Sequence, residues 1–440
     1  MLLADGFLLF RSNASVGIDG YYYVIQADVF RTTGHFYFPT STPIVLIFFS
    51  VLSVLIPSTV IAIKAGVLMI QTFFYVGLAI LIRKLTDEDL LSLLGLFLAF
   101  FSGLHFYYIS EFLSNLGALT FLVWSALSFF RYAADGSRSY LIISMGLLVG
   151  ACLCHRSIPY LLVSFFIAGI LSVSYLRIRS RKQLILVVFA FFSVFFTPLI
   201  ISIQPLFDLP PWINNEISPI PQNPFRPLMR MEGLCLALVD LVMIWTLFKH
   251  PQNTKINLTI TTSLLLVVWN VMFLLNPFLQ HPVGVNSLFA RISTIAFIPF
   301  AILVPLVFRA LSGLSQNLLY ATCIMLIPIL LFRLQTPFPV ELRETSIRKR
   351  EKLIRDVPTL VSQTCQYPFI VAKHGDQFLV TAVTGSPAQH LLPSENRYGC
   401  IFVLSQKPFN RTIGSLSARK IENSDGDISL VEISDPLQKK

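Results

Sequence analysis

The sequence predicts an all-α polytopic membrane protein with a small α+β tail at its C-terminal end. Hydrophobic residues make up 55% of the 440 residues and charged residues only 13%, about half the charged share of an average soluble domain. The mean hydropathy is +0.71. The apolar residues fall in blocks of roughly 17–22 residues with few or no charges, which is the length that a helix needs to cross a bilayer.

These blocks predict about ten transmembrane helices. They lie near 60–82, 90–109, 112–130, 140–154, 157–176, 183–203, 233–249, 257–276, 292–309 and 316–334. A further apolar run at 43–56 is only about 14 residues long, which suits an interfacial helix as well as a span. The first ten residues, MLLADGFLLF, are too short to span and no small-residue cleavage site follows them, so they do not indicate a signal peptide.

The basic residues between the blocks predict the orientation. One side of the bundle collects Arg83, Lys84, Arg131, Arg138, Arg177, Arg179, Arg181, Lys182, Lys249, Lys255 and Arg309. The links on the other side, such as 109–112 and 155–157, are poor in Lys. By the positive-inside rule the basic side is cytoplasmic, and the two ends of the chain are extracytoplasmic. The net charge of +10 therefore reflects topology, and no basic stripe of the nucleic-acid-binding kind is present.

Three parts follow from this pattern. Residues 1–59 form an outer first loop with juxtamembrane helices, residues 60–334 a transmembrane helix bundle, and residues 335–440 an extracytoplasmic tail domain. In the tail we expect a charged helix through Arg355, strands at 369–372, 378–383 and 400–404, and a frayed polar end from Ser415. Cys365 and Cys400 are the only plausible disulfide pair. No CxxC or other ligand spacing indicates a metal or a cofactor.

The outward side carries few ionisable residues, which makes them functional candidates. Asp19 stands between Gly17 and Gly20 and is followed by three tyrosines. A carboxylate fixed there can act as a base on an acceptor hydroxyl or amine, with Tyr22 and Tyr23 on the adjacent helix face. Alternatively, Asp19 caps the helix and the tyrosines form a membrane-interface belt.

Three further places on the same side carry candidates. Glu111 lies in a very short link and is either functional or an acid favoured by the helix dipole. His155 and Arg156 lie where two apolar blocks meet, where the cation either contacts an anion or snorkels to the headgroups. His281 and Arg291 lie in and after an outer loop, and Arg291 either binds phosphate or anchors the interface.

The order of these motifs resembles the GT-C superfamily of membrane glycosyltransferases. The matching elements are Asp19 with Tyr21–Tyr23, His35, Pro39 and Pro43 before IVLIFFSVLSVLI, then LAILIRKL, FYYISEFLSN and GLLVGACLCHRSIPYLL. The chain is most similar to bacterial members related to protein mannosyltransferases and lipid A aminoarabinose transferases. The resemblance covers residues 15–175 by motif and 176–334 by helix arrangement.

The resemblance implies transfer of a sugar from a polyprenyl-phosphate carrier to a glycan, lipid or protein acceptor at the outer face of a bacterial plasma membrane. Asp19 matches the acid that acts as catalytic base in that family. Glu111 is then expected to orient the acceptor or His155, and Arg291 and Arg156 to hold the leaving phosphate, where charge builds up. Many members carry a second acid directly after the first, and Gly20 at this place argues against a metal-dependent mechanism. Members also begin with a full spanning helix, so we expect a late start or a shortened version of the fold.

Two other classes of function stay open. A transporter or flippase for a lipid-linked saccharide is expected to carry ionisable residues deep within its spans and internal repeats. The sequence shows neither property, since its charges cluster at the helix ends. A non-catalytic partner in envelope-polysaccharide assembly needs neither property, and Gly20 and the short N-terminal segment are compatible with it.

Overall fold

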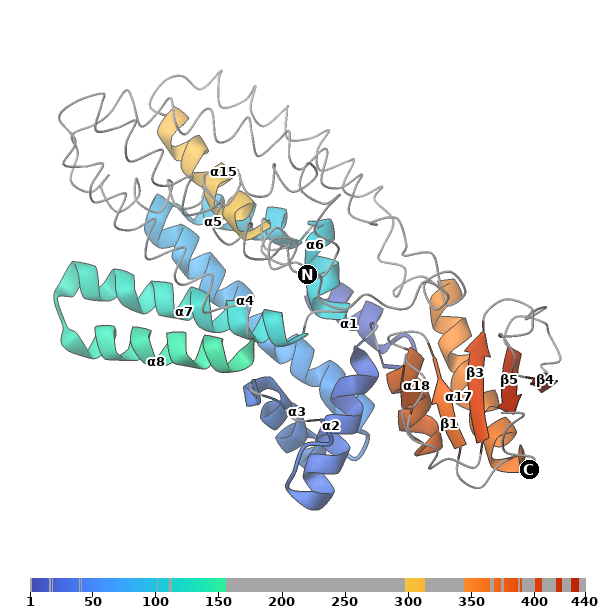
Figure 1. Cartoon of the computed structure of the whole chain (residues 1–440). Coiled ribbons are helices and arrows are strands. Elements are labelled where there is room, and N and C mark those ends of the chain that lie inside the picture. Colours follow the sequence, from blue (N-terminus) through green and yellow to red (C-terminus); the bar gives the residue numbers. More distant parts are fainter. Residues whose placement is uncertain are drawn as a thin grey trace, which may run out of the picture.

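A computed structural model gives the structure of the protein. It describes residues 2–15, 17, 19–38, 40, 42–100, 102–110, 113–155, 297–312, 344–364, 368–372, 376–386, 388–389, 400–405, 417–421 and 429–434. Helices dominate the first 155 residues, and a mixed helix and sheet module follows near the C-terminal end (Figure 1).

The N-terminal part is built from four helices. They are α1 (Leu2–Phe10), α2 (Gly20–Thr33), α3 (Ile44–Leu55) and α4 (Thr59–Thr86). Gly34 ends α2 in the left-handed conformation with φ 74°, where a residue without Cβ is favoured. The short apolar run at 43–56 forms α3, whose length of 12 residues is too small to cross a bilayer.

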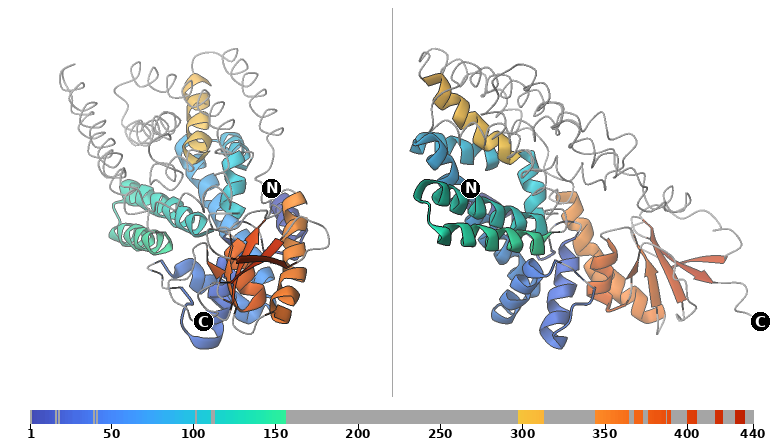
Figure 2. Two further views of the ribbon diagram at one scale, coloured as in Figure 1. Left: turned by 45° about the vertical axis from the view of Figure 1, so that its right-hand side comes forward. Right: turned by 60° about the vertical axis from the view of Figure 1, so that its left-hand side comes forward.

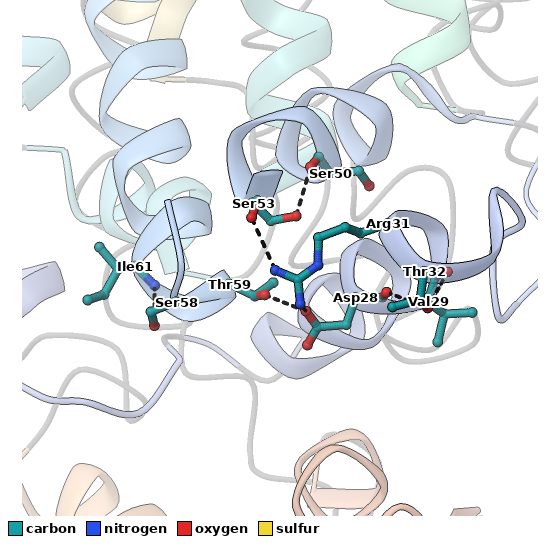
Figure 3. A network of polar contacts seen from close by, with 9 residues as sticks. All are labelled: Asp28, Val29, Arg31, Thr32, Ser50, Ser53, Ser58, Thr59 and Ile61. Carbon is teal, nitrogen blue, oxygen red and sulfur yellow. Dashed lines mark hydrogen bonds and ion pairs between the residues drawn. The ribbon is translucent and has the colours of Figure 1, made fainter. Parts of the chain in front are cut away.

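Polar contacts fix α2 and α3 against the start of α4. Arg31 forms an ion pair with Asp28 at 3.2 Å and donates to the backbone oxygen of Ser53 at 3.2 Å. Asp28 also accepts a hydrogen bond from the Thr59 hydroxyl in the first turn of α4. Figure 3 shows this network between the three helices. The outer helices are therefore held in a defined position over the end of α4.

The next helices are α5 (Asp89–Phe100), α6 (Gly103–Ser110), α7 (Leu113–Asp135) and α8 (Arg138–Cys154), and α15 (Phe297–Ser312) packs against α5. Of these, α5 and α7 pack against α4, and α6 and α8 pack against α7. α7 and α8 form an antiparallel hairpin, with α7 against α4 (Figure 1). The prediction of one span over 90–109 is wrong, because the helix is interrupted around Ser102. Gly103 directly after Ser102 is a weak helix former, and local hydropathy does not register such an interruption.

Two of the described helices are long and apolar enough to cross a membrane. They are Thr59–Thr86 and the part of α7 from Leu113 to Tyr132, which correspond to the predicted spans at 60–82 and 112–130. Three shorter apolar helices accompany them, Ile44–Leu55, Asp89–Phe100 and Arg138–Cys154. The predicted spans at 157–176, 183–203, 233–249, 257–276 and 316–334 lie outside the described residues. The described part thus favours association with a membrane on the strength of two helices.

A charged cluster marks one end of the bundle. Arg309 near the end of α15 lies 3.0 Å from Glu88 and 3.6 Å from Asp87, and Arg83 lies 2.7 Å from Asp89. Arg83 and Arg309 therefore lie at the same end of the described bundle.

The C-terminal module is α+β, as predicted. It contains α17 (Glu344–Thr364), β1 (Pro368–Val371), α18 (Asp376–Thr384), β2 (Ala388–Gln389), β3 (Cys400–Ser405), β4 (Ser417–Ile421) and β5 (Ser429–Ser434). The sheet order is β2-β1-β3-β5-β4. β1 is parallel to β2 and β3, and β5 is antiparallel to β3 and β4. Cys365 lies outside the described residues, so its pairing with Cys400 stays a prediction.

Two predictions for the tail are wrong. The segment 378–383 is the helix α18, because a short apolar run fits either a strand or a helix and its packing against α17 and α2 decides between them. The stretch after Ser415 is not frayed throughout, since β4 and β5 pair with each other and β5 pairs with β3. Backbone pairing across the sheet stabilises these strands, although the segment around them is polar.

The tail module packs on the N-terminal helices. α18 contacts α2, and Figures 1 and 2 show the two helices side by side from different directions. The hairpin turn between α7 and α8 lies at the opposite end of the described structure (Figure 1). α2 and the tail module therefore lie at the same end of the described structure.

Candidate functional site

Asp19 stands directly before the first residue of α2. It occupies the N-cap position with φ −91° and ψ 1°, and its side chain makes no capping hydrogen bond to the helix. Its backbone oxygen accepts from the amide of Tyr23 at 3.3 Å. The alternative that the Asp19 carboxylate caps α2 is therefore wrong.

Tyr23 connects this segment to the start of α7. Its hydroxyl lies 2.9 Å from Oγ of Ser114 and accepts from the Ser114 amide at 3.2 Å. The ring packs edge-on against Phe49 with centroids 5.6 Å apart. Burial raises the pKa of Tyr23 well above its ordinary value, and the negative charge of Asp19 raises it further. Two motifs that are far apart in the sequence, around Asp19 and around FYYISEFLSN, therefore meet in the fold.

Tyr22 points to the tail. Its ring stacks on Phe38 with centroids 5.7 Å apart and meets Phe378 of α18 edge-on at 5.4 Å. Gln26 donates to the Tyr22 hydroxyl at 3.1 Å and exchanges two hydrogen bonds with the backbone of Phe38. Burial raises the pKa of Tyr22, and the charge of Asp19 adds to the effect. We call Tyr22, Tyr23, Phe38 and Phe378 the aromatic wall.

The loop before Asp19 is held from two sides. The Ser12 hydroxyl donates to Glu351 Oε1 on α17 at 2.7 Å, and Nζ of Lys64 on α4 donates to the Ser12 backbone oxygen at 2.6 Å. Nη1 of Arg350 donates to the Ser15 backbone oxygen at 3.4 Å. The tail helix and α4 together thus fix the loop that leads to Asp19.

Steric crowding explains why glycine occupies position 20. A Cβ at this position would lie 2.5 Å from Oγ and 3.2 Å from Cβ of Ser15. The Ser15 amide donates to the Tyr21 hydroxyl at 3.2 Å, which keeps Ser15 in place. No room therefore exists for a second acid after Asp19, and a single carboxylate is what this segment offers.

The other predicted residues are placed as follows. His155 follows the last residue of α8 in an extended conformation, and its amide donates to the Ala151 oxygen at 3.2 Å. α8 also contacts α3, so this end of α8 lies toward the outer helices. The other four predicted residues, Glu111, Arg156, His281 and Arg291, lie outside the described residues. Asp19 therefore lies close to Tyr22 and Tyr23. The two arginines that are predicted to bind phosphate, Arg156 and Arg291, are not among the described residues.

A buried polar cluster escaped the sequence analysis. Asp5 on α1, Gln71 and Tyr75 on α4, and His105 on α6 lie together in the bundle. His105 belongs to the HFYY segment, but α1 is too short to be recognised as part of a bundle. Only the packing of α1 on α4 brings Asp5 to His105.

Metal binding finds no support in the described part of the chain, where no group of three or more His, Cys, Asp or Glu side chains converges. No protein-family model matches the chain, and no curated protein is significantly similar to it.

Proposed function

We propose that the protein is a membrane glycosyltransferase of the GT-C type, which transfers a sugar from a polyprenyl-phosphate carrier to an extracytoplasmic acceptor. The observation that carries the proposal is the position of Asp19 at the edge of the aromatic wall. A carboxylate next to aromatic rings suits sugar chemistry, because the rings cover the apolar faces of a sugar while the carboxylate accepts a proton.

The proposal includes the full membrane topology. About ten helices span a bacterial plasma membrane, with the α2 loop and the tail on the extracytoplasmic face. The ion pairs of Arg83 and Arg309 at one end of the bundle, and the contact between α18 and α2 at the other, support this orientation.

In the proposed reaction Asp19 removes a proton from the acceptor hydroxyl or amine. The acceptor oxygen or nitrogen then attacks the anomeric carbon, and the bond from that carbon to the phosphate oxygen breaks. The electron pair leaves with the polyprenyl phosphate, where negative charge develops. Arg291 and Arg156 are proposed to hold this phosphate, and Glu111, His155 and His281 to position the substrates.

Replacing Asp19 with Asn tests the base. Membranes that contain the protein receive polyprenyl phosphate carrying a radiolabelled sugar, and the label that leaves the lipid phase for an acceptor is measured. Asp19→Asn keeps the size of the side chain and removes its basicity, so we expect a loss of about 10²–10⁴-fold in turnover.

Asp28→Asn is the matched control. Asp28 lies on the same helix, its side chain is 41% exposed, and it contacts Arg31 and Thr59. We expect this variant to retain turnover. Wild-type turnover in Asp19→Asn would refute the assignment of the base.

The buried pair of Asp5 and His105 favours a second function. Coupled transporters carry ionisable groups deep in their spans, and these two side chains are 0% and 1% exposed. A flippase for a lipid-linked saccharide moves the labelled lipid across sealed vesicles without releasing its sugar. Movement without transfer, unchanged in Asp19→Asn, would select this function.

A further inference from the structure

We propose that Asp5 and His105 hold a single exchangeable proton in a dry polar site between α1, α4 and α6. The site is separate from Asp19 and its aromatic wall. The proposal does not depend on glycosyl transfer, because it rests on the geometry of the buried cluster alone.

The four side chains of the cluster form one connected group. Asp5 Oδ2 lies 3.4 Å from His105 Nε2 and accepts a hydrogen bond from the Gln71 amide. The same amide nitrogen lies 3.1 Å from His105 Nε2. The Tyr75 hydroxyl lies 2.9 Å from His105 Nδ1. Asp5 and His105 are therefore close enough to share a proton.

Two buried oxygen atoms of the cluster lack a donor. Asp5 Oδ1 and Gln71 Oε1 have no hydrogen-bond partner among the residues that the structure describes. Both side chains are 0% exposed, so bulk water does not compensate them. A buried carboxylate with one oxygen unsatisfied is strongly disfavoured in the charged form. Binding a proton neutralises Asp5 and converts one acceptor into a donor.

The Gln71 amide fits two protonation states. With its nitrogen toward Asp5 and His105, it donates to a carboxylate and to an unprotonated Nε2. After a half-turn of the amide its oxygen takes the same place and accepts from a protonated Asp5 or from a protonated Nε2. The cluster can therefore gain a proton by rotating one side chain, without opening the helix packing.

Of the titratable side chains on the neighbouring helices, Asp5 and His105 are the two that we propose bind the proton. From α4, the titratable groups nearest in the chain to Gln71 are Tyr75 and Lys64. The Lys64 ammonium donates to the Ser12 backbone oxygen and lies over the Phe10 ring at 5.9 Å, beyond the end of α1. From α6, His105 faces Asp5 directly. Lys64 therefore interacts with the loop after α1 and does not neutralise Asp5 by contact.

The interruption of the helix at Ser102 is a second feature of this place. His105 lies in the first turn of α6, immediately after the interruption, and its amide donates to the Ser102 oxygen at 3.0 Å. Interrupted helices are where membrane transporters hold coupling ions, because the helix no longer runs through and polar groups point inward. The position of His105 directly after the interruption therefore supports a bound proton.

Infrared spectroscopy of the full-length protein in lipid nanodiscs tests the proposal. Spectra are recorded between roughly pH 6 and pH 9, well above the ordinary value of about 3.9 for Asp, so that exposed aspartates stay ionised. We expect a carbonyl stretch of a protonated carboxyl that appears reversibly as the pH falls, shifts on labelling with ¹³C-aspartate and is absent in Asp5→Asn. The matched control, Asp28→Asn, should keep the band. In His105→Gln the dependence of this band on pH should change, because the partner that shares the proton is removed.

If Asp5→Asn does not fold, Asp5→Glu keeps the proposal testable, because the protonated carboxyl band should then remain but no longer shift on labelling with ¹³C-aspartate. The same titration with and without sodium ions separates a proton site from a cation site. An absent aspartate band throughout this range would overturn the proposal, and so would a band that Asp5→Asn leaves in place. A signal that follows sodium and not pH would overturn it as well.

Discussion

A close approach between α5 and α15 takes place at Gly95. A Cβ at this position would lie 2.5 Å from the backbone oxygen of Ala301 and 2.4 Å from Cδ1 of Ile82. The Ile82 methyl group can rotate away, but the carbonyl belongs to a helix backbone. Pro305, four residues further along, has no N–H to donate to that carbonyl. Glycine at such a helix contact lets two backbones approach closely.

The substitution Gly95→Ala therefore forces the two helices apart. Overpacking of this kind costs about 1–3 kcal/mol. Replacing glycine inside a helix returns about 0.5–1 kcal/mol, so the net destabilisation should be about 1–2 kcal/mol. Thermal unfolding of the purified protein in detergent, followed by intrinsic fluorescence, measures the difference.

Gly146→Ala on α8 is the matched control. A Cβ at Gly146 would meet nothing within 4 Å, so only the gain in helix propensity of about 0.5–1 kcal/mol applies. The two substitutions should shift the unfolding temperature in opposite directions. Equal shifts, or a stabilised Gly95→Ala variant, would show that α5 and α15 do not pack as described.

Three more predictions follow from the contacts around the site and the charged end. Asp19→Asn should lower the pKa of Tyr22 because one cause of its rise is removed; tyrosinate absorbance measures this. A raised phenol pKa lowers the free energy of unfolding only as the pH rises above the ordinary value of 10.0. The loss of stability above this pH should therefore also be smaller in the variant. Phe378→Ala removes ring contacts worth about 0.5–1.5 kcal/mol each and should increase hydrogen exchange in α2, with the melting of the helix bundle unchanged. Arg309→Ala breaks ion pairs whose side chains are 41–75% exposed, so we expect a loss of about 0–1 kcal/mol that shrinks in high salt; melting at two salt concentrations checks it.

Local patterns were enough for the helices that cross the described bundle. The blocks at 60–82 and 112–130 became α4 and α7 with ends shifted by a few residues. The apolar length that a helix needs, and the Lys and Arg that follow it, are properties of the segment itself. The glycines and tyrosines around Asp19 likewise predict the helix that begins directly after it.

The sequence by itself determined the apolar blocks, the basic ends and the segment around Asp19, because each depends on neighbouring residues. Only the tertiary structure decided that 378–383 is a helix, since packing on α2 selects between two conformations that fit the same short run. The same holds for Gly20, whose lack of space comes from Ser15. It holds most of all for Asp5 and His105, which are 100 residues apart and become one buried pair only when α1 packs between α4 and α6.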